Sequence, residues 1–325
     1  KVITQHLPTS IVNDDTILMI GPGAAITPEI LINEIIKYQS IIGHRKIVIH
    51  PRAVLILEEH RDIERKTIRS GSTFKGCGAA QSCKIMRGND VVLIGSEKGR
   101  EILISCIQDI ADNDQMIDYL LDRIVIDDTG AMINNFIDDV DSVIVEGSHG
   151  FDLDINYGLN YPHTTSRQCH AGQLVADCGI SPRLVDDIIM IMRPYPIRIS
   201  NTTEFGTISS GDYDGSKEIT WEEVKRRCGA PRDVHFGEIT TVTKRMRRVF
   251  ELNVDRRRYA VQINRPTGIA INFMQYVDWD AYKCKSWDEL PNKAKNFVAF
   301  VEDITGAPVV LIGTGPADSD IIDCR

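Results

Sequence analysis

Three segments of the chain concentrate side chains that can bind anions or move protons. The first is Gly71-Ser72-Thr73-Phe74-Lys75-Gly76-Cys77-Gly78, in which glycines, hydroxyls and a lysine precede a helical pattern that ends near Arg87. Backbone N–H groups of such a loop can approach a phosphate while hydroxyls and the cation add hydrogen bonds. The spacing is not that of a P-loop, so a plain glycine-rich turn is the default interpretation of this segment alone.

The other two segments combine a histidine with glycines, and threonines with arginines. Glu146-Gly147-Ser148-His149-Gly150 follows an apolar run, 142–145, that predicts a strand. Ligands of α/β proteins bind where parallel strands end, so His149 is a candidate for a polar task, although a solvated loop histidine explains it equally well. Thr240-Thr241-Val242-Thr243-Lys244-Arg245-Met246-Arg247-Arg248 fits carboxylate or phosphate capture, or else a solvated basic loop. Together the three segments predict a protein that binds phosphorylated, acidic small molecules.

The net charge limits the partners that we expect. Lys and Arg total 37 against 46 Asp and Glu, which gives −9 at pH 7, so the chain is not expected to bind nucleic acid. Anionic substrates must then be held by local arginine clusters. No apolar run approaches the ~20 residues of a membrane span, and no signal peptide is visible, so we expect no membrane partner and a cytoplasmic location. The eight cysteines form no C-x-x-C pair, which favours buried or idle thiols.

The alternation of apolar runs and helical patterns predicts an α/β fold with a mainly parallel central sheet covered by helices. Strands are expected at 17–20, 46–50, 91–94, 142–145, 187–192, 269–273 and 308–312. Helices are expected at 98–111, 116–123, 171–178, 254–264 and 291–305, and after Thr27, which would cap a helix that Pro28 begins. We expect a single domain over 1–325, with 201–237 as a polar surface insertion that contains a short helix near 221–227.

These segments, in this order, resemble the adenylosuccinate synthetase family over essentially the whole chain. Residues 71–87 resemble the family's G-T-T-G-R-G-x-G-P-A segment with its trailing Lys and Arg. Residues 146–150 and 161–166 resemble E-G-A-Q-G and Y-P-Y-V-T-S, 241–248 resembles T-T-G-R-R-R-R, and 312–316 resembles S-T-G-P. Four ordered matches are highly specific. The resemblance implies the P-loop-related fold of that family.

The resemblance also implies roles for particular residues. The nucleotide substrate would be bound by Ser72, Thr73, Arg87, Thr165, Arg245, Ile199 and Ser200, with Arg87 reaching across a homodimer interface. Aspartate would be bound by Thr241, Val242, Thr243, Arg245 and Arg247, and the triphosphate donor by Arg247, Asn272, Phe273, Gln275, Gly313, Thr314 and Gly315. His149 takes the place of the glutamine that contacts the purine 6-oxygen and would be the catalytic residue. In this family O6 is phosphorylated with Mg²⁺ assisting, and the aspartate amine then displaces the phosphate; the metal ligands stay unknown.

Three departures from the family pattern refine the prediction. The family's N-terminal glycine-rich loop, with its catalytic acid/base, has no counterpart after Lys1, so we expect either that the chain lacks its start or that the protein is inactive. The family's guanine-reading T-K-L-D is replaced by Asn272-Phe273-Met274-Gln275; an amide both donates and accepts, so adenine becomes readable and ATP or dATP is the expected donor. The G-P-F-P-T-E stretch is missing after Ile197-Arg198-Ile199-Ser200.

These departures resemble the phage branch of the family, the 2-aminoadenylosuccinate synthetases. That branch implies condensation of dGMP with L-aspartate, driven by ATP, to make the precursor of 2-aminoadenine for DNA, in the host cytoplasm if the protein is phage-encoded. Two alternatives stay open at this point. One is an adenylosuccinate synthetase that acts on IMP, and the other is a catalytically dead nucleotide-binding homologue.

Overall fold

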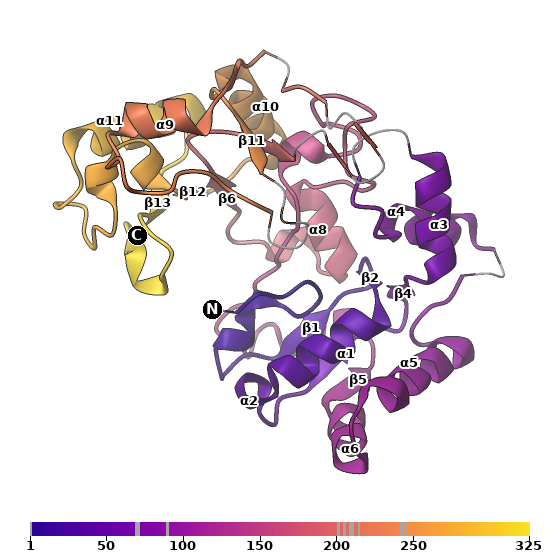
Figure 1. Ribbon diagram of the computed structural model, residues 1–325. Coiled ribbons are helices and arrows are strands. Elements are labelled where there is room, and N and C mark those ends of the chain that lie inside the picture. Colours follow the sequence, from indigo (N-terminus) through magenta and orange to yellow (C-terminus); the bar gives the residue numbers. More distant parts are fainter. Residues whose placement is uncertain are drawn as a thin grey trace. The chain divides into compact units, whose positions relative to one another are not determined.

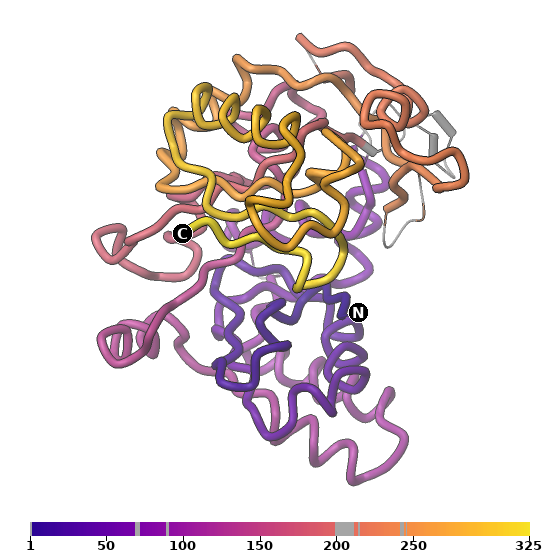
Figure 2. The backbone as a smooth tube through the Cα atoms, turned by 90° about the vertical axis from the view of Figure 1, so that its left-hand side faces the viewer, coloured from indigo at the N-terminus to yellow at the C-terminus, as the bar shows by residue number. Residues whose placement is uncertain are grey.

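Short runs of isoleucine, leucine and valine form the buried strands of both units into which the chain divides. The structure, a computed structural model, describes residues 2–68, 72–88, 91–199, 202–203, 206–207, 211–213, 215–240, 244 and 246–325. Unit 1 comprises Lys1–Ile68, Thr73–Ser148 and Gly172–Leu184, and unit 2 comprises Arg69–Ser72, His149–Ala171 and Val185–Arg325 (Figures 1 and 2). The expected single domain over 1–325 stays a prediction.

Unit 1 is built on a parallel three-stranded sheet in the order β1-β3-β5. Leu18 pairs with Ile47 and Ile47 pairs with Ile124, and β1 and β3 are almost fully buried in the main apolar core of the unit. A second parallel pair joins β2 to β4. The strands are β1 Leu18–Ile20, β2 Ala25–Ile26, β3 Ile47–Ile49, β4 Val54–Leu55 and β5 Ile124–Ile126.

Helices cover these strands with one apolar face each. In α1 the side chains of Leu31, Ile32 and Ile35 are fully buried, as the helical spacing of apolar residues requires; α1 lies beside α5 in Figure 1. The helix begins at Pro28 and Thr27 is its N-cap residue, as expected, although the Thr27 side chain makes no capping hydrogen bond. The helices of unit 1 are α1 Pro28–Lys37, α2 Gln39–Ile42, α3 Glu58–Thr67, α4 Cys77–Met86, α5 Glu97–Ile110, α6 Asp114–Arg123, α7 Thr129–Phe136 and α8 Ala171–Cys178.

Unit 2 is built on a four-stranded sheet in the order β14-β13-β12-β6, in which β6, β12 and β13 are parallel and β14 is antiparallel. Helix α11 packs on this sheet through Val298 and Val301, in the orange-to-yellow part of Figure 2. An antiparallel sheet β10-β11-β7 and a hairpin β8-β9 complete the strands. The elements are β6 Ile189–Met192, β7 Ile197–Ile199, β8 Thr202–Thr203, β9 Gly206–Thr207, β10 Glu218–Ile219, α9 Trp221–Cys228, β11 Arg247–Phe250, α10 Val254–Asn264, β12 Gly268–Ile271, α11 Asn292–Thr305, β13 Val309–Gly313 and β14 Ile321–Asp323.

The predicted mixed α/β class with parallel strands is confirmed, and most predicted elements occur within a few residues of their expected bounds. Two strand predictions are wrong. Residues 142–145 form no strand, and Ile144 is 84% exposed; residues 91–94 make only an isolated bridge between Leu93 and Val54. Apolar β-branched residues become a strand only where another backbone is available to pair with them.

The segment 201–237 is more than a surface feature in its second half. Helix α9 buries Trp221, Val224 and Cys228 in a cluster with Phe236 and Tyr276. Its N-terminus is capped by the Thr220 hydroxyl, which accepts a hydrogen bond from the Glu223 N–H. In the described part of the chain, no helix combines the length and the apolar character that crossing a membrane requires.

Candidate active site

The C-terminal edge of the unit 2 sheet brings together the two segments predicted to bind the triphosphate donor. Met192, Ile271 and Ile312 are aligned across β6, β12 and β13. Because the three strands are parallel, Arg193, the segment Asn272–Gln275 and the segment Gly313–Gly315 all emerge at this edge. Ligands of open α/β sheets bind at this edge. The sequence prediction that 272–275 and 313–315 act together is therefore consistent with their positions.

Gly313 and Asn272 are in close approach at this edge. A Cβ at position 313 would lie 2.6 Å from the Asn272 side-chain oxygen, so glycine leaves room for that amide. Phe273 adopts a left-handed backbone conformation with φ of 68°, which is uncommon for an aromatic residue. Its ring is stacked on Tyr276 at 5.3 Å between centroids. The Phe273 ring thus lies at the strand ends in contact with Tyr276.

The side-chain oxygen of Gln275 is a buried hydrogen-bond acceptor to which no described residue donates. Its side-chain oxygen is inaccessible to water and has no hydrogen-bond partner among the described residues. A buried amide oxygen without a donor costs about 1–3 kcal/mol. Because water cannot reach this oxygen, a ligand could donate to it and remove that penalty only after the amide turns toward the strand ends.

Arg193 links the segment Asn272–Gln275 to β11 through Glu238. It was not among the residues predicted from the sequence. Its guanidinium lies 4.2 Å from the centroid of the Phe273 ring, within cation–π range, and pairs with Glu238. Glu238 also lies 4.0 Å from the Arg247 guanidinium. Burial, together with the neighbouring carboxylate of Glu238, raises the pKa of Tyr276 far above its usual value. Arg193 directly follows a strand that was correctly predicted, and that position was the signal that could have identified it.

Thr314 and Gly315 are turned into the protein rather than toward a ligand. Thr314 is fully buried, and its hydroxyl donates to the backbone oxygens of Cys284 (2.9 Å) and Asp320 (2.8 Å). A side chain at Gly315 would meet the Asp320 carboxylate at 2.5 Å. Any contact that these two residues make with a donor would therefore come from their backbone.

His149 sits in a loop with a left-handed backbone conformation, φ 72°. Although its side chain is exposed at the surface, the protein atoms around the ring and the positive charge of Arg167 lower the pKa of the imidazole. The ring is therefore predominantly neutral near pH 7, when one nitrogen can donate and the other accept. The strand expected before this loop is absent from residues 142–145, so a turn rather than a strand end positions His149.

The glycine-rich segment of unit 1 is organised differently from the expectation of a phosphate cradle. The Glu64 carboxylate is buried and accepts hydrogen bonds from the N–H groups of Gly76 (2.8 Å), Gly78 (2.7 Å) and Ala79. These amides at the start of α4 are thus already bound to an anion and are not available to a phosphate. A phosphate could therefore meet only the residues of this segment before Gly76, among which Thr73 is exposed and Ser72 is half-buried.

Arg87 ends α4 in an exposed position. Its backbone is left-handed, with φ 57°, and the two preceding side chains, Ile85 and Met86, are each 76% exposed. Two large apolar side chains beside an exposed arginine are the composition expected of a protein interface. The arrangement is consistent with the predicted contact of Arg87 across a homodimer.

Several predicted residues lie outside the described part of the chain or serve another purpose. Ser200, Thr241, Val242, Thr243 and Arg245 lie outside the described residues, and for Ile199 only the backbone, in β7, is described. Arg248, the last residue of the predicted basic segment, lies in β11, pairs with Glu218 (2.6 Å) and Asp212 (2.9 Å), and donates to the Gly211 oxygen. Arg248 therefore fastens the segment 211–218 to β11.

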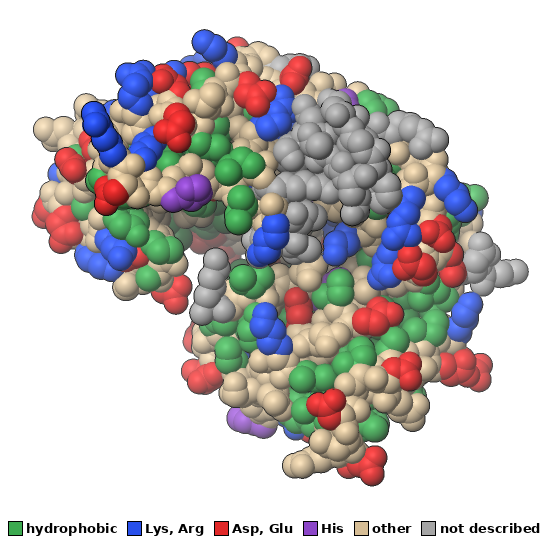
Figure 3. Space-filling model, viewed as in Figure 1, with side chains coloured by type: hydrophobic (Ala, Val, Ile, Leu, Met, Phe, Trp, Pro, Cys, Tyr) green, Lys and Arg blue, Asp and Glu red, His purple; other side chains and the backbone are tan. Residues whose placement is uncertain are grey.

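The metal-ligating side chains of the described residues are dispersed and do not form clusters that could hold a metal ion. On the face shown in Figure 3, Lys and Arg side chains are interspersed with Asp and Glu. No group of three or more His, Cys, Asp or Glu side chains is assembled to hold a metal, counting described residues only. Mg²⁺ usually binds through one or two carboxylates and the phosphates of its substrate.

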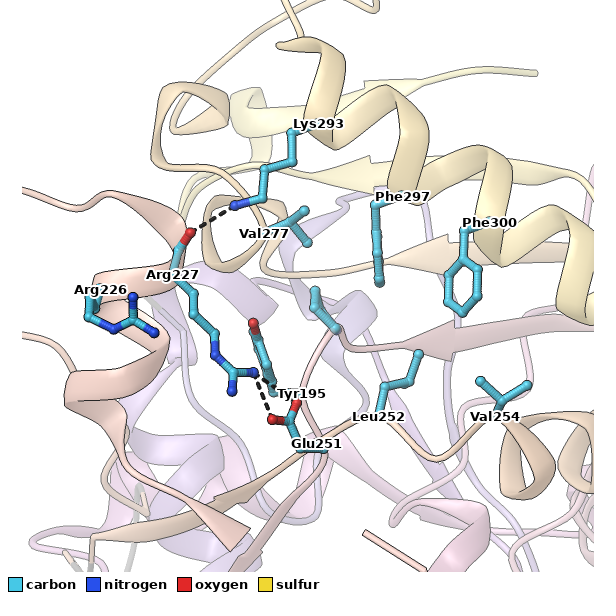
Figure 4. Close-up of a pocket in the computed structure, with 11 residues that line it drawn as sticks. Tyr195, Arg226, Arg227, Glu251, Leu252, Val254, Val277, Lys293, Phe297 and Phe300 are labelled. Carbon is cyan, nitrogen blue, oxygen red and sulfur yellow. Dashed lines mark hydrogen bonds and ion pairs between the residues drawn. The ribbon is translucent and has the colours of Figure 1, made fainter. Parts of the chain in front are cut away.

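A separate hollow of about 650 Å³ in unit 2 contains none of the predicted site residues (Figure 4). Phe297 and Phe300 of α11 line one side. On the other side Arg227 pairs with Glu251, and Lys293 donates to the Arg227 oxygen at 2.7 Å. These cations are engaged by protein groups, so we assign the hollow no part in the candidate site.

The chain resembles the same group of proteins in sequence and in structure. The family model described as adenylosuccinate synthetase matches residues 1–279 and 273–322. The adenylosuccinate synthetase of Pyrococcus horikoshii is 30% identical over 100% of this chain and 84% of its own length. The succinoaminodeoxyadenylate synthetase of cyanophage S-2L, solved bound to dGMP and to dATP as an energy donor, aligns with a TM-score of 0.75 and 26% identity over 98% of this chain and 79% of that chain. The fully ligated adenylosuccinate synthetase of Plasmodium falciparum aligns with a TM-score of 0.77 at 20% identity over 98% of this chain and 87% of that chain, which shows the fold alone.

Proposed function

Since the chain belongs to the adenylosuccinate synthetase family of carbon–nitrogen ligases, we propose that it condenses dGMP with L-aspartate, using ATP or dATP as the phosphoryl donor. The product is 2-amino-2′-deoxy-N6-succinyladenylate, the precursor of 2-aminoadenine in DNA. Guanine gives up its N1 proton to a base, O6 attacks the γ-phosphorus, and the nucleoside diphosphate leaves. The aspartate amine then attacks C6, inorganic phosphate departs, and the new C–N nitrogen loses a proton.

The observation that carries this proposal is the unused acceptor of Gln275 at the donor edge of the sheet. The 6-amino group of adenine can donate to the amide oxygen while N1 accepts from the amide nitrogen. Guanine presents an oxygen and an N–H in those places, so it cannot satisfy both halves of the same amide in one orientation. The neighbouring Phe273 ring, in contact with Tyr276 and Arg193, lies at the same edge of the sheet.

The cyanophage enzyme supports the choice of both nucleotides. That protein is bound to dGMP and dATP, and its likeness to this chain extends over 98% of the residues. We assign the 5′-phosphate of dGMP to Thr73 and Thr165, with Arg87 supplied by the second subunit of a homodimer. We assign to neutral His149 the donation of a hydrogen bond to O6 as charge develops there. Mg²⁺ would accompany the triphosphate and supply charge neutralisation at the transferring phosphoryl group.

A second candidate is synthesis of adenylosuccinate from IMP. The curated relatives favour it, because they carry the name adenylosuccinate synthetase at 29% and 30% identity. The two candidates differ at the purine 2-position, where dGMP has an amine and IMP has none. A site with a polar group for that amine rejects IMP, because the group would be left unpaired. We expect Ser200, outside the described residues, to supply it.

One set of assays separates the candidates. The full-length protein is incubated with Mg²⁺ and aspartate, with ATP, dATP or GTP as donor, and with dGMP, GMP or IMP as acceptor. The proposal expects turnover with dGMP and an adenine donor well above every other combination. Equal use of IMP would replace the proposal by the second candidate, and absence of turnover with any combination would leave a nucleotide-binding protein without activity.

A further inference from the structure

A closed loop in unit 2 carries Thr165, and a single buried carboxylate lies at its base. The loop runs from Asp154 to Cys169, and its two sides are joined where the Ile155 N–H donates to the Arg167 oxygen at 3.1 Å. Thr165 itself donates its N–H to the Leu153 oxygen at 2.7 Å. The position of Thr165 is therefore set by backbone bonds at the base of the loop rather than by its own side chain.

Asp154 holds both ends of this base. Its side chain is fully buried, with 0% of its surface exposed. One carboxylate oxygen accepts from the N–H groups of Asn156 (2.8 Å) and Tyr157 (3.0 Å), where the loop begins. The other oxygen accepts from the N–H of Cys169, where the loop ends. Charge-assisted hydrogen bonds of this kind are roughly twice as strong as neutral ones.

We propose that Asp154 is a positioning residue for the 5′-phosphate of the nucleotide substrate, acting through Thr165. The carboxylate has acceptor sites for all three amides, and no neutral side chain of the same size can replace it. It fixes the loop before the substrate arrives, so binding does not have to order Thr165. This inference rests on the proposed function, in which Thr165 contacts the phosphate.

Asp152, two residues earlier, provides a matched comparison. It is also largely buried, but it pairs with Arg256 at 3.0 Å and Arg257 at 3.4 Å, and it accepts from the Tyr213 hydroxyl. Its carboxylate thus links the loop to α10 and to residue 213, and its described partners include no amide of the loop. Loss of the Asp152 charge removes these ion pairs and leaves in place the three amide hydrogen bonds that Asp154 accepts.

The test compares Asp154→Asn with Asp152→Asn in steady-state kinetics of the full chain with its Mg²⁺, aspartate and ATP. Asparagine would turn an amide N–H₂ toward the Cys169 N–H, so Asp154→Asn is expected to raise KM for dGMP about tenfold, equivalent to one lost hydrogen bond. KM for ATP and aspartate should stay at the parent value. Binding of deoxyguanosine, which lacks the phosphate, should not change. Asp154→Glu, which keeps the charge, should recover part of the dGMP affinity, and Asp152→Asn should lower thermal stability without altering KM for dGMP.

The outcomes separate this inference from the proposed function. If Thr165→Ala leaves KM for dGMP unchanged, the assignment of the phosphate site is wrong. If Thr165→Ala raises it while Asp154→Asn does not, or if Asp154→Asn weakens dGMP and deoxyguanosine equally, the positioning role is overturned. Failure of both Asp154 variants to fold would assign the residue to folding alone and would also overturn it.

Discussion

Replacing Gln275 by glutamate tests how the protein selects its phosphoryl donor at nearly constant side-chain volume. The parent amide offers an oxygen and an N–H₂, and its oxygen is buried without a described partner. A carboxylate can only accept hydrogen bonds, so it loses the contact to adenine N1 and faces that acceptor instead. Guanine offers two donors, N1–H and the 2-amino group, which suit a carboxylate. We therefore expect Gln275→Glu to shift use from ATP toward GTP.

The expected size of the shift from ATP to GTP follows from the burial of the Gln275 side-chain oxygen. Leaving a buried polar group unpaired costs about 1–3 kcal/mol. At about 1.4 kcal/mol per factor of ten, the ratio of kcat/KM for ATP to that for GTP should fall roughly ten- to a hundredfold. The change should appear mainly in KM for the donor, because the base lies far from the γ-phosphorus where bonds change.

The assay measures kcat/KM for ATP and GTP in the parent, in Gln275→Glu and in Gln275→Leu, with dGMP and aspartate saturating. Leucine removes the hydrogen bonds without adding a charge, so it should weaken ATP without improving GTP. An ATP-to-GTP ratio that is the same in parent and Gln275→Glu would refute the reasoning, since it would mean that Gln275 does not contact the base. Better use of GTP than ATP by the parent would refute the donor assignment itself.

Three further perturbations test other parts of the site. Arg87→Ala should weaken dGMP binding. Mixing this variant with Thr73→Ala should restore part of the turnover, because in a mixed homodimer one of the two sites has both Thr73 and Arg87. A protein that sediments as a monomer would contradict this prediction. Glu64→Gln should lower the free energy of unfolding in urea by about 1–3 kcal/mol, because a buried amide oxygen cannot replace a carboxylate that accepts from three N–H groups. Glu59→Gln, on the exposed face of α3, should leave that free energy unchanged. Equal urea midpoints of unfolding for the two variants would disprove the role of Glu64. Because the pKa of His149 lies below its usual value, turnover should persist as pH falls through the ordinary range of histidine and decline only below it, and His149→Gln should remove that decline from the pH–rate profile. An unchanged profile in His149→Gln would assign the titration to another group.

The sequence by itself determined the class of fold, most elements and the family. Apolar runs such as 46–50 and 308–312 identified strands because buried parallel strands need continuous apolar residues. Pro28 and the apolar spacing after it identified a helix because that geometry depends on local contacts alone. Segments 272–275 and 313–315 were predicted to bind the donor from their resemblance to the family, and the parallel pairing of β12 and β13 explains why two segments so far apart in sequence lie at one edge.

Only the tertiary structure decided which polar groups are free to meet a ligand. Residues 142–145 are as apolar as other strands, yet no backbone among the described residues pairs with them as a strand, and no local pattern encodes the presence of a partner. The glycine-rich segment looked like a phosphate cradle until Glu64, twelve residues before Gly76, proved to occupy its amides. Thr314 matched a family motif, but its side chain is buried in the protein. Arg193 and Asp154 matched no motif, yet Arg193 contacts the Phe273 ring and Asp154 binds the amides of the loop that carries Thr165. Hydrogen bonds between residues distant in sequence form only after the chain has folded, so residue types and spacing alone could not reveal them.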